Sequence, residues 1–111
     1  MRQYVVSEIT PDEMERLTKL LTDRGCAAGV EGIFWLPVPE EHLTDIQKEH
    51  AEQCGPHVMA LETNGDSVGL ELLVRAKGRI RCDCIGWAGD GLVLAMMREV
   101  DALLAQAGHA E

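Results

Sequence analysis

Three cysteines and two histidines of this chain have the residue types and spacings of a metal site. His50 and Cys54 are four residues apart, so on a helix their side chains would share one face, and His57 follows three residues later. Further along, Cys82 and Cys84 form a Cys-X-Cys pair whose thiols would point the same way on a strand. Thiolate and imidazole are ligand types that zinc takes in proteins. The sequence therefore offers a zinc site at His50, Cys54 and His57, to which Cys82 and Cys84 could add ligands.

The spacing also gives reasons against that site. It matches no zinc-finger or zinc-ribbon pattern, which would need two Cys-X2–4-Cys knuckles or their histidine equivalents. If Cys82 lies on a strand, His57 is two strand spacings away, about 9–10 Å, which is long for two ligands of one ion. The alternative is that Cys82 and Cys84 are small core residues, as buried free cysteines commonly are. A catalytic Cys54 is disfavoured, because the dipole at a helix C-terminus raises a thiol pKa.

The second candidate site is a basic cluster in an acidic chain. Four of the ten basic residues fall between positions 75 and 81, and strand alternation places three of these arginines on the outward face. An apolar centre rimmed by arginine is typical of an interface. We therefore predict an interaction patch of Leu73, Arg75, Arg79, Arg81 and Ile85, covered by a second copy of the chain or by an acidic protein partner. The alternative is a solvated hairpin edge whose charges keep the strands from aggregating.

A glycine-rich stretch, GWAGDG at 86–91, lies where a strand would pass into a helix. Backbone N–H groups at a helix start can hold phosphate. The spacing here is neither GxGxxG nor a P-loop, and Asp90 would repel an anion. We interpret the stretch as a loop in which Asp90 caps the following helix.

Three helices are predicted from caps and apolar periodicity. The first follows Thr10-Pro11, where Thr is the N-cap and Glu13 completes a capping box, and it ends at Gly25. A polar second helix is expected over 40–54, and a strongly amphipathic third one over 92–107. Two short strands are expected over 3–9 and 32–38.

Three further strands are predicted over 57–63, 67–75 and 79–85. Asn64-Gly65 is the signature of a two-residue type I′ hairpin, which would pair Leu61 with Val68 and Met59 with Leu70. For the second turn, a three-residue loop over 76–78 gives all three strands the same apolar side. This register turns seven side chains towards the helices: Val68, Leu70, Leu72, Val74, Ile80, Cys82 and Cys84.

The element order β-α-β-α-β-β-β-α predicts an α+β fold, with a mostly antiparallel sheet and three helices packed on one face. A length of 111 residues suits a single domain over 1–111, with a frayed tail at 108–111. The apolar fraction of 46% and the charged fraction of 26% are ordinary for a globular protein.

Composition and charge narrow the classes of function. The N-terminus lacks the apolar core of a secretory signal and no apolar run approaches membrane-spanning length, so we expect a cytoplasmic protein with free thiols. A net charge of −9 argues against nucleic-acid and anionic membrane partners. The leading interpretation is a non-enzymatic interaction or ligand-binding module that self-associates. The alternative is a metal- or thiol-dependent protein with zinc as the candidate cofactor.

Overall fold

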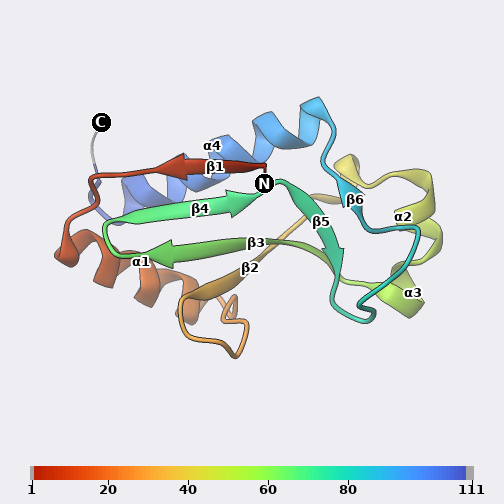
Figure 1. Ribbon diagram of the computed structural model, residues 1–111, viewed down its shortest axis with the longest axis horizontal. Coiled ribbons are helices and arrows are strands. Elements are labelled where there is room, and N and C mark those ends of the chain that lie inside the picture. The colour runs from red at the N-terminus through yellow and green to blue at the C-terminus, as the bar shows by residue number, and fades with distance from the viewer. Residues whose placement is uncertain (1, 110–111) are drawn as a thin grey trace.

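The computed structural model describes residues 2–109, in which six antiparallel strands form one sheet (Figure 1). Strand β3 (His57–Asn64) is its centre and pairs with β2 (Ile33–Pro37) along one edge. Along its other edge β3 pairs first with β4 (Ser67–Glu71) and then with β5 (Leu73–Ala76). Strand β1 (Gln3–Val6) adds to β4, and the short β6 (Gly86–Trp87) adds to β5. The predicted α+β class with an antiparallel sheet is confirmed.

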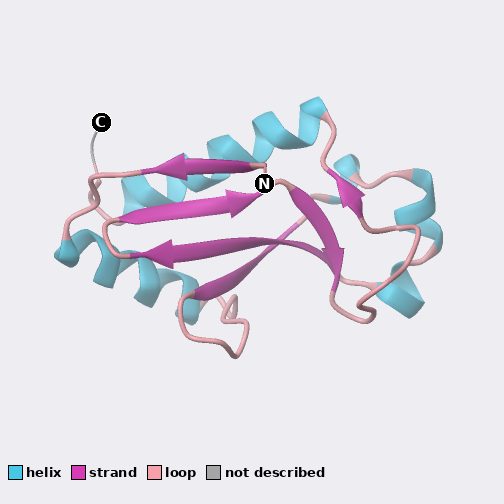
Figure 2. Ribbon diagram, viewed as in Figure 1, coloured by secondary structure: helices cyan, strands magenta, loops and turns pink. Residues whose placement is uncertain are grey.

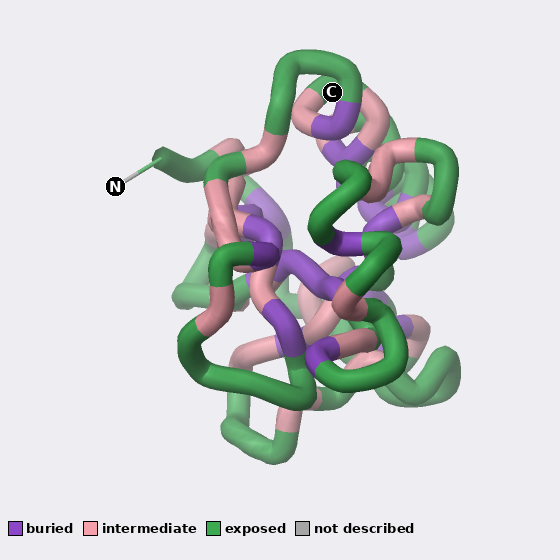
Figure 3. Tube along the Cα trace, turned by 90° about the vertical axis from the view of Figure 1, so that its right-hand side faces the viewer, coloured by how far each residue is buried: buried purple, intermediate pink, exposed green. Residues whose placement is uncertain are grey.

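Two long helices, α1 (Pro11–Asp23) and α4 (Asp90–Gln106), pack against one face of this sheet (Figure 2). Leu17 and Leu21 of α1 and Met96 of α4 meet the inward side chains of β3 and β4, among them Met59 and Leu70. Buried segments lie in the middle of the molecule and exposed ones around it (Figure 3). Burying these large apolar side chains supplies the main driving force for folding, roughly 1.5–3 kcal/mol for each.

Helix α1 begins and ends where the sequence predicts. The Thr10 hydroxyl accepts from the Glu13 N–H at 3.2 Å, and the Glu13 carboxylate accepts from the Thr10 N–H at 2.9 Å, which completes the capping box. At the other end Arg24 is the C-cap and Gly25 follows with φ of +76°. A positive φ at that position is the usual helix stop, and glycine adopts it without steric cost.

The predicted helix over 40–54 was wrong, because that segment is broken into three turns. A 3-10 turn at Glu40–His42 is followed by α2 (Asp45–Glu49) and α3 (Ala51–Cys54). A second capping box, between Thr44 and Gln47, starts α2 after Leu43 has left helical geometry. These short helices lie at the end of the molecule near β5 and β6 (Figure 1), so two helices rather than three cover the sheet.

The β3–β4 hairpin has the predicted faces but a shifted register. Its turn is Gly65-Asp66, with Asn64 opposite Ser67 and Leu61 opposite Leu70, two residues away from the predicted pairing. A type I′ turn at Asn64-Gly65 would need a positive φ at both positions. Within residues 2–109, Glu8 is the one non-glycine residue with a positive φ, so Asn64 does not adopt it. The faces survive, since a shift of two residues preserves strand alternation.

The predicted strand over 79–85 was also wrong. Ala76 pairs with Arg79 across the two-residue turn Lys77-Gly78, and the chain then leaves the sheet as a loop. Ile80, predicted to face the helices, is 93% exposed. Cys84 is buried and Cys82 half-buried, but they pack with Cys54 and Ala76 in a small second cluster instead of the main core. This loop follows α3 because the Lys77 and Gly78 N–H groups donate to carbonyls of Pro56 and Cys54.

The C-terminal helix begins two residues earlier than predicted. Gly89, not Asp90, is its N-cap, and Leu92 joins its buried face. The predicted frayed tail falls partly on residues 110–111, which lie outside the described residues. Gly108 and His109 are held in place: the Gly108 N–H donates to Ala105, and the His109 Nδ1 lies 3.0 Å from a Glu13 carboxylate oxygen. Among the helices within residues 2–109, none combines the length and the apolar composition of a membrane span.

Candidate metal centre

Four side chains from two distant parts of the chain converge beside the small second cluster. His50, Cys54, Cys82 and Cys84 each offer one ligand atom, and these four atoms all lie within 4.8 Å of one another. The His50 Nδ1 is 3.0 Å from the Cys82 sulfur, and the sulfurs of Cys54 and Cys82 are 3.5 Å apart. Cys54 and Cys84 are buried, whereas His50 and Cys82 are half-buried. The group is therefore a compact Cys3His set near the surface.

The break between α2 and α3 places the first two members. His50 ends α2 and begins α3, and its carbonyl accepts from the Cys54 N–H at 2.8 Å. This single helical turn points the side chains of His50 and Cys54 the same way, as the i, i+4 spacing predicts. Immediately after it, Gly55 and a cis Pro56 turn the chain into β3.

The loop after β5 brings the other two members to the same place. The Ile85 N–H donates to the Cys82 carbonyl, which curls the Cys-X-Cys segment into a turn. Gln47 reaches across from α2, and its Nε2 donates to the Cys84 carbonyl at 3.0 Å in a buried contact. Gln47 was not singled out from the sequence. The sequence signal that could have identified Gln47 is the T-x-x-Q capping box with Thr44, because this box fixes the side of the helix on which the glutamine lies.

The three thiols compete for protons in the metal-free protein. The Cys84 backbone N–H donates to the Cys82 sulfur and, with the Cys84 thiol and His50, lowers the pKa of Cys82 to about 6. Burial, with the neighbouring sulfurs, raises the pKa of Cys84 to about 12. Burial also raises the pKa of Cys54, against the effect of the Arg79 positive charge, which lowers it. A dication would replace these shared protons and satisfy all three sulfurs together.

The spacing of the four atoms suits a tetrahedral zinc ion. With a Zn–S distance of about 2.3 Å, two sulfurs on one tetrahedral ion are separated by about 3.8 Å. The separation of 3.5 Å between Cys54 and Cys82 is close to this value, and the upper bound of 4.8 Å leaves room for the remaining pairs. The separation of 3.0 Å between the His50 Nδ1 and the Cys82 sulfur is shorter than the tetrahedral value of about 3.5 Å, and the upper bound of 4.8 Å is longer than it. Enclosing the ion would therefore need side-chain shifts of up to about an ångström. Soft thiolate ligands favour zinc over magnesium or calcium, which take oxygen ligands.

His57, predicted as a ligand with His50 and Cys54, is not in the group of four. Its side chain is 5% exposed at the start of β3, and its Nε2 finds no hydrogen-bond partner within residues 2–109. Cys82 and Cys84, predicted as additional ligands, complete the set instead. The sequence argument that His57 and Cys82 are too far apart for one ion agrees with this grouping. Its premise was wrong, however, because Cys82 lies in a loop and not on a strand.

His57 is expected to make the protein sensitive to acid. Its pKa is lowered in the folded state by burial and, secondarily, by the nearby His50. Above its ordinary value of 6.5 the imidazole is neutral in both states and has no effect. Below that value the unfolded chain takes up a proton that the folded chain resists. The free energy of unfolding therefore decreases as the pH is lowered. Urea unfolding of chelator-treated protein at about pH 7.5 and about pH 5.5 should show a smaller loss for His57→Gln than for wild type. Equal losses in the two proteins would contradict this role.

The residues of the predicted interaction patch are partly brought together. Arg75 lies on β5 and forms a bidentate pair with Glu71 at 2.7 and 3.1 Å. Arg75, Arg79 and Ile85 line one hollow of about 310 Å³, whereas Leu73 and Arg81 do not line it. Ile80 and Trp35, which the prediction left out, belong to the same hollow. Whether this patch binds a partner stays a prediction.

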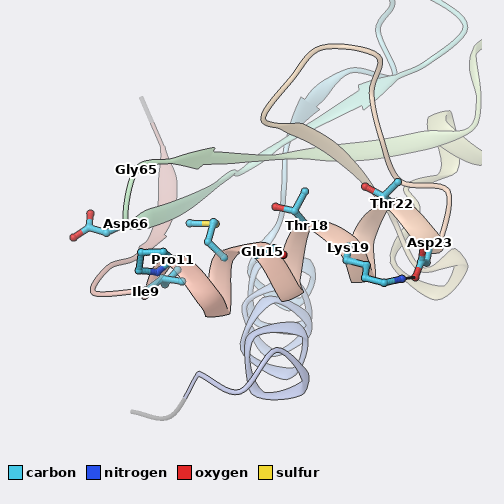
Figure 4. Close-up of a pocket in the computed structure, with 10 residues that line it drawn as sticks. Ile9, Pro11, Glu15, Thr18, Lys19, Thr22, Asp23, Gly65 and Asp66 are labelled. Atoms are coloured by element: carbon cyan, nitrogen blue, oxygen red, sulfur yellow. Dashed lines mark hydrogen bonds and ion pairs between the residues drawn. The ribbon is translucent and has the colours of Figure 1, made fainter.

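The cavities elsewhere give weaker indications of function. A groove of about 680 Å³ runs along α1, between that helix and the β3–β4 turn, and none of the four candidate ligands lines it (Figure 4). Ile9 and Met14 contribute apolar surface to it, while Lys19 and Asp23 bind each other at 2.8 Å at one end. Its one cation, Lys19, is thus held by Asp23, and the other two charged lining residues, Glu15 and Asp66, are both acidic. No set of groups suited to a ligand follows from this lining, so we assign the groove no function.

Comparison with known proteins adds no assignment: no family model, curated protein or solved structure matches this chain.

Proposed function

We propose that this protein binds one zinc ion through His50, Cys54, Cys82 and Cys84, and that the ion serves to hold the fold together. The observation that carries the proposal is the convergence of four zinc-type ligand atoms, all within 4.8 Å of one another, from segments about thirty residues apart. The three thiols form no disulfide, so once deprotonated they could supply three of the four ligands, and His50 could supply the fourth.

A structural role follows from the number of ligands. A catalytic zinc keeps one coordination position for water or substrate, whereas four protein ligands close a tetrahedral site. Here the chain supplies three sulfurs and one imidazole nitrogen, so an ion bound by all four has no open position. Such an ion would fasten the loop over 77–85 to α3. Apart from the ion, the small apolar cluster of Cys54, Ala76 and Cys84 joins these two segments. The proposal follows the metal-dependent alternative of the sequence analysis and gives the ion no catalytic step.

The basic residues beside the site support the same proposal. Zinc with three thiolates carries a net charge of −1, which is costly to place in a partly buried position. Arg79 lies close enough to lower the pKa of Cys54 electrostatically, so its charge also offsets the thiolates. One residue of the basic cluster, Arg79, would thus act within the chain.

Metal analysis of the purified protein tests the proposal. Reduced protein prepared without chelator should contain about one zinc per chain, and Cys54→Ser should lose it, because a hydroxyl is a far weaker zinc ligand than a thiolate. Cys26→Ser is the matched control: Cys26 is half-buried against the main core, outside the four-residue group. Wild-type protein that neither contains zinc nor takes it up after reduction would refute the proposal, as would equal zinc loss in both variants.

A further inference from the structure

The sheet face opposite α1 and α4 carries an apolar surface that these helices do not cover. Both tryptophans of the chain contribute to it, Trp35 from β2 and Trp87 from β6. Trp87 is 49% exposed and Val5 of β1 is 51% exposed. Their cross-strand partners, Ala60 for Trp35 and Leu73 for Trp87, point to the same side of the sheet. Tryptophan is the residue most enriched at the energetic centres of protein interfaces.

Charges of opposite sign lie at the two ends of this face. At the β3–β4 turn, Glu62 points outwards beside Ile33, its partner on β2, and Asp66 lies in the turn itself. At the other end, Arg75 lies opposite Val58 across the strands, but its charge is matched by Glu71 of the same face. The net positive charge of this end therefore comes from Lys77 and Arg79, which follow. The length of β3 separates these ends by roughly 20 Å. One face therefore has an acidic end, an apolar middle and a basic end.

The basic end is also hollowed. Its hollow of about 310 Å³ has Trp35, Val58 and Ile85 among its lining residues, together with basic Arg75, Lys77 and Arg79. Within residues 2–109, no carboxylate forms an ion pair with Lys77 or Arg79. Ile80, 93% exposed, borders the same hollow. An occupant that fits must present an apolar group next to a carboxylate.

We infer that the occupant is a second copy of this chain, packed face to face with its strands reversed. A twofold axis lying between the two sheets and running across the strands near Ala60 would set the acidic end of each copy over the basic end of the other. Glu62 and Ile33 of one copy would then meet the hollow beside Lys77 and Arg79 of the other copy, and the same contact would recur on the other side. Such self-complementary contacts are what a twofold interface requires.

The centre of the face permits close approach of two sheets. Ala60 lies in the middle of β3, so the central position of this face carries a small side chain. Two packed sheets interdigitate at about 10 Å, and bulky groups are best placed around small ones. Trp35 and Val5 flank this centre on either side. The inference does not rest on zinc, because Val5, Trp35, Ala60 and Glu62 all lie on strands outside the ligand group.

Sedimentation velocity of zinc-treated protein tests this inference. Wild type should sediment as a dimer at about 100 μM, and Ala60→Glu should sediment as a monomer, because it buries an unpaired charge at the centre of the interface. Leu94→Glu is the matched control, since Leu94 is 49% exposed on α4, away from this face, and should leave the dimer intact. A monomeric wild type at this concentration would overturn the inference.

A charge exchange provides a second test that is independent of Ala60. Glu62→Lys and Lys77→Glu should each weaken dimerisation about tenfold or more by placing like charges together, and the double variant should recover most of the loss. Lys77 is exposed and is not a proposed zinc ligand, so metal content should stay unchanged in all three variants. Additive losses without recovery would rule out the reversed packing. Failure here would leave the zinc proposal intact, because that proposal is tested by metal content.

Discussion

Removing zinc from the loaded protein is expected to lower its melting temperature by about 15 °C. A ligand that binds only the folded state, present at a thousand times its dissociation constant, stabilises that state by about 4 kcal/mol. In a domain of this size each kcal/mol of unfolding free energy shifts the melting temperature by roughly 4 °C. The structure explains why so much stability would depend on the ion. The loop over 77–85 leaves the sheet and is held by the small cluster of Cys54, Ala76 and Cys84, which contains little apolar surface.

Thermal unfolding with and without chelator measures this effect. Cys84→Ser should melt near the metal-free wild type and respond little to added zinc, because it lacks one of the four ligands. Cys26→Ser should respond to zinc as wild type does, even if its own melting temperature is slightly changed. Identical melting curves for loaded and stripped wild type would show that no structural ion is present.

Helix α1 and the inward face of the central strands could be predicted from the sequence, because the sequence signals for these elements are local and mutually consistent. Thr10 and Glu13 fix the start of α1, and Gly25 fixes its end, through hydrogen bonds and backbone angles that involve a few neighbouring residues. Strand alternation from His57 to Glu71 fixes which side chains face the helices, so Leu61 and Leu70 were placed on the core side despite the shifted turn. Alternation tolerates a shift of two residues but not of one.

The loop over 79–85 could not be predicted by the same reasoning. Its residues alternate charged and apolar side chains as a half-buried strand does, yet Cys82 and Cys84 face a cluster formed with α3. Alternation identifies which residues share a side, and it does not identify what lies on that side. The decisive contacts are long-range: the Gly78 N–H donates to the Cys54 carbonyl at 2.8 Å, twenty-four positions earlier in the chain.

The candidate metal site could be predicted only in part, because local spacing groups each pair of ligands but long-range contacts bring the two pairs together. His50 and Cys54 could be grouped by helical spacing, and Cys82 and Cys84 by their own spacing, because each pair is local. Joining the two pairs required knowing that the segment after Lys77 turns back along α3. His57 was preferred because it is near Cys54 in sequence, but β3 carries its side chain into a buried position where its Nε2 has no partner among the described residues.

Gly78→Ala is expected to weaken zinc binding about 10- to 100-fold, the range seen when groups that orient metal ligands are removed. A Cβ at this position would lie 3.0 Å from the carbonyl oxygens of both Gln53 and Cys54. Both contacts are backbone atoms of the turn that carries Cys54, so neither can move aside as a flexible side chain would. The loop and α3 must therefore move apart by a few tenths of an ångström, which moves Cys82 and Cys84 relative to His50 and Cys54.

Competition with a zinc-binding indicator dye measures this loss of affinity directly. Gly86→Ala is the matched control, because a Cβ on Gly86, in the adjacent strand β6, would meet no atom within 4 Å. It should bind zinc as wild type does, although it makes the same chemical change close to the site. If both variants bound zinc with wild-type affinity, the close approach of the loop to α3 would not be what positions the ligands. If Gly78→Ala alone binds more weakly, the ion depends on a contact between two segments that neither segment's sequence reveals.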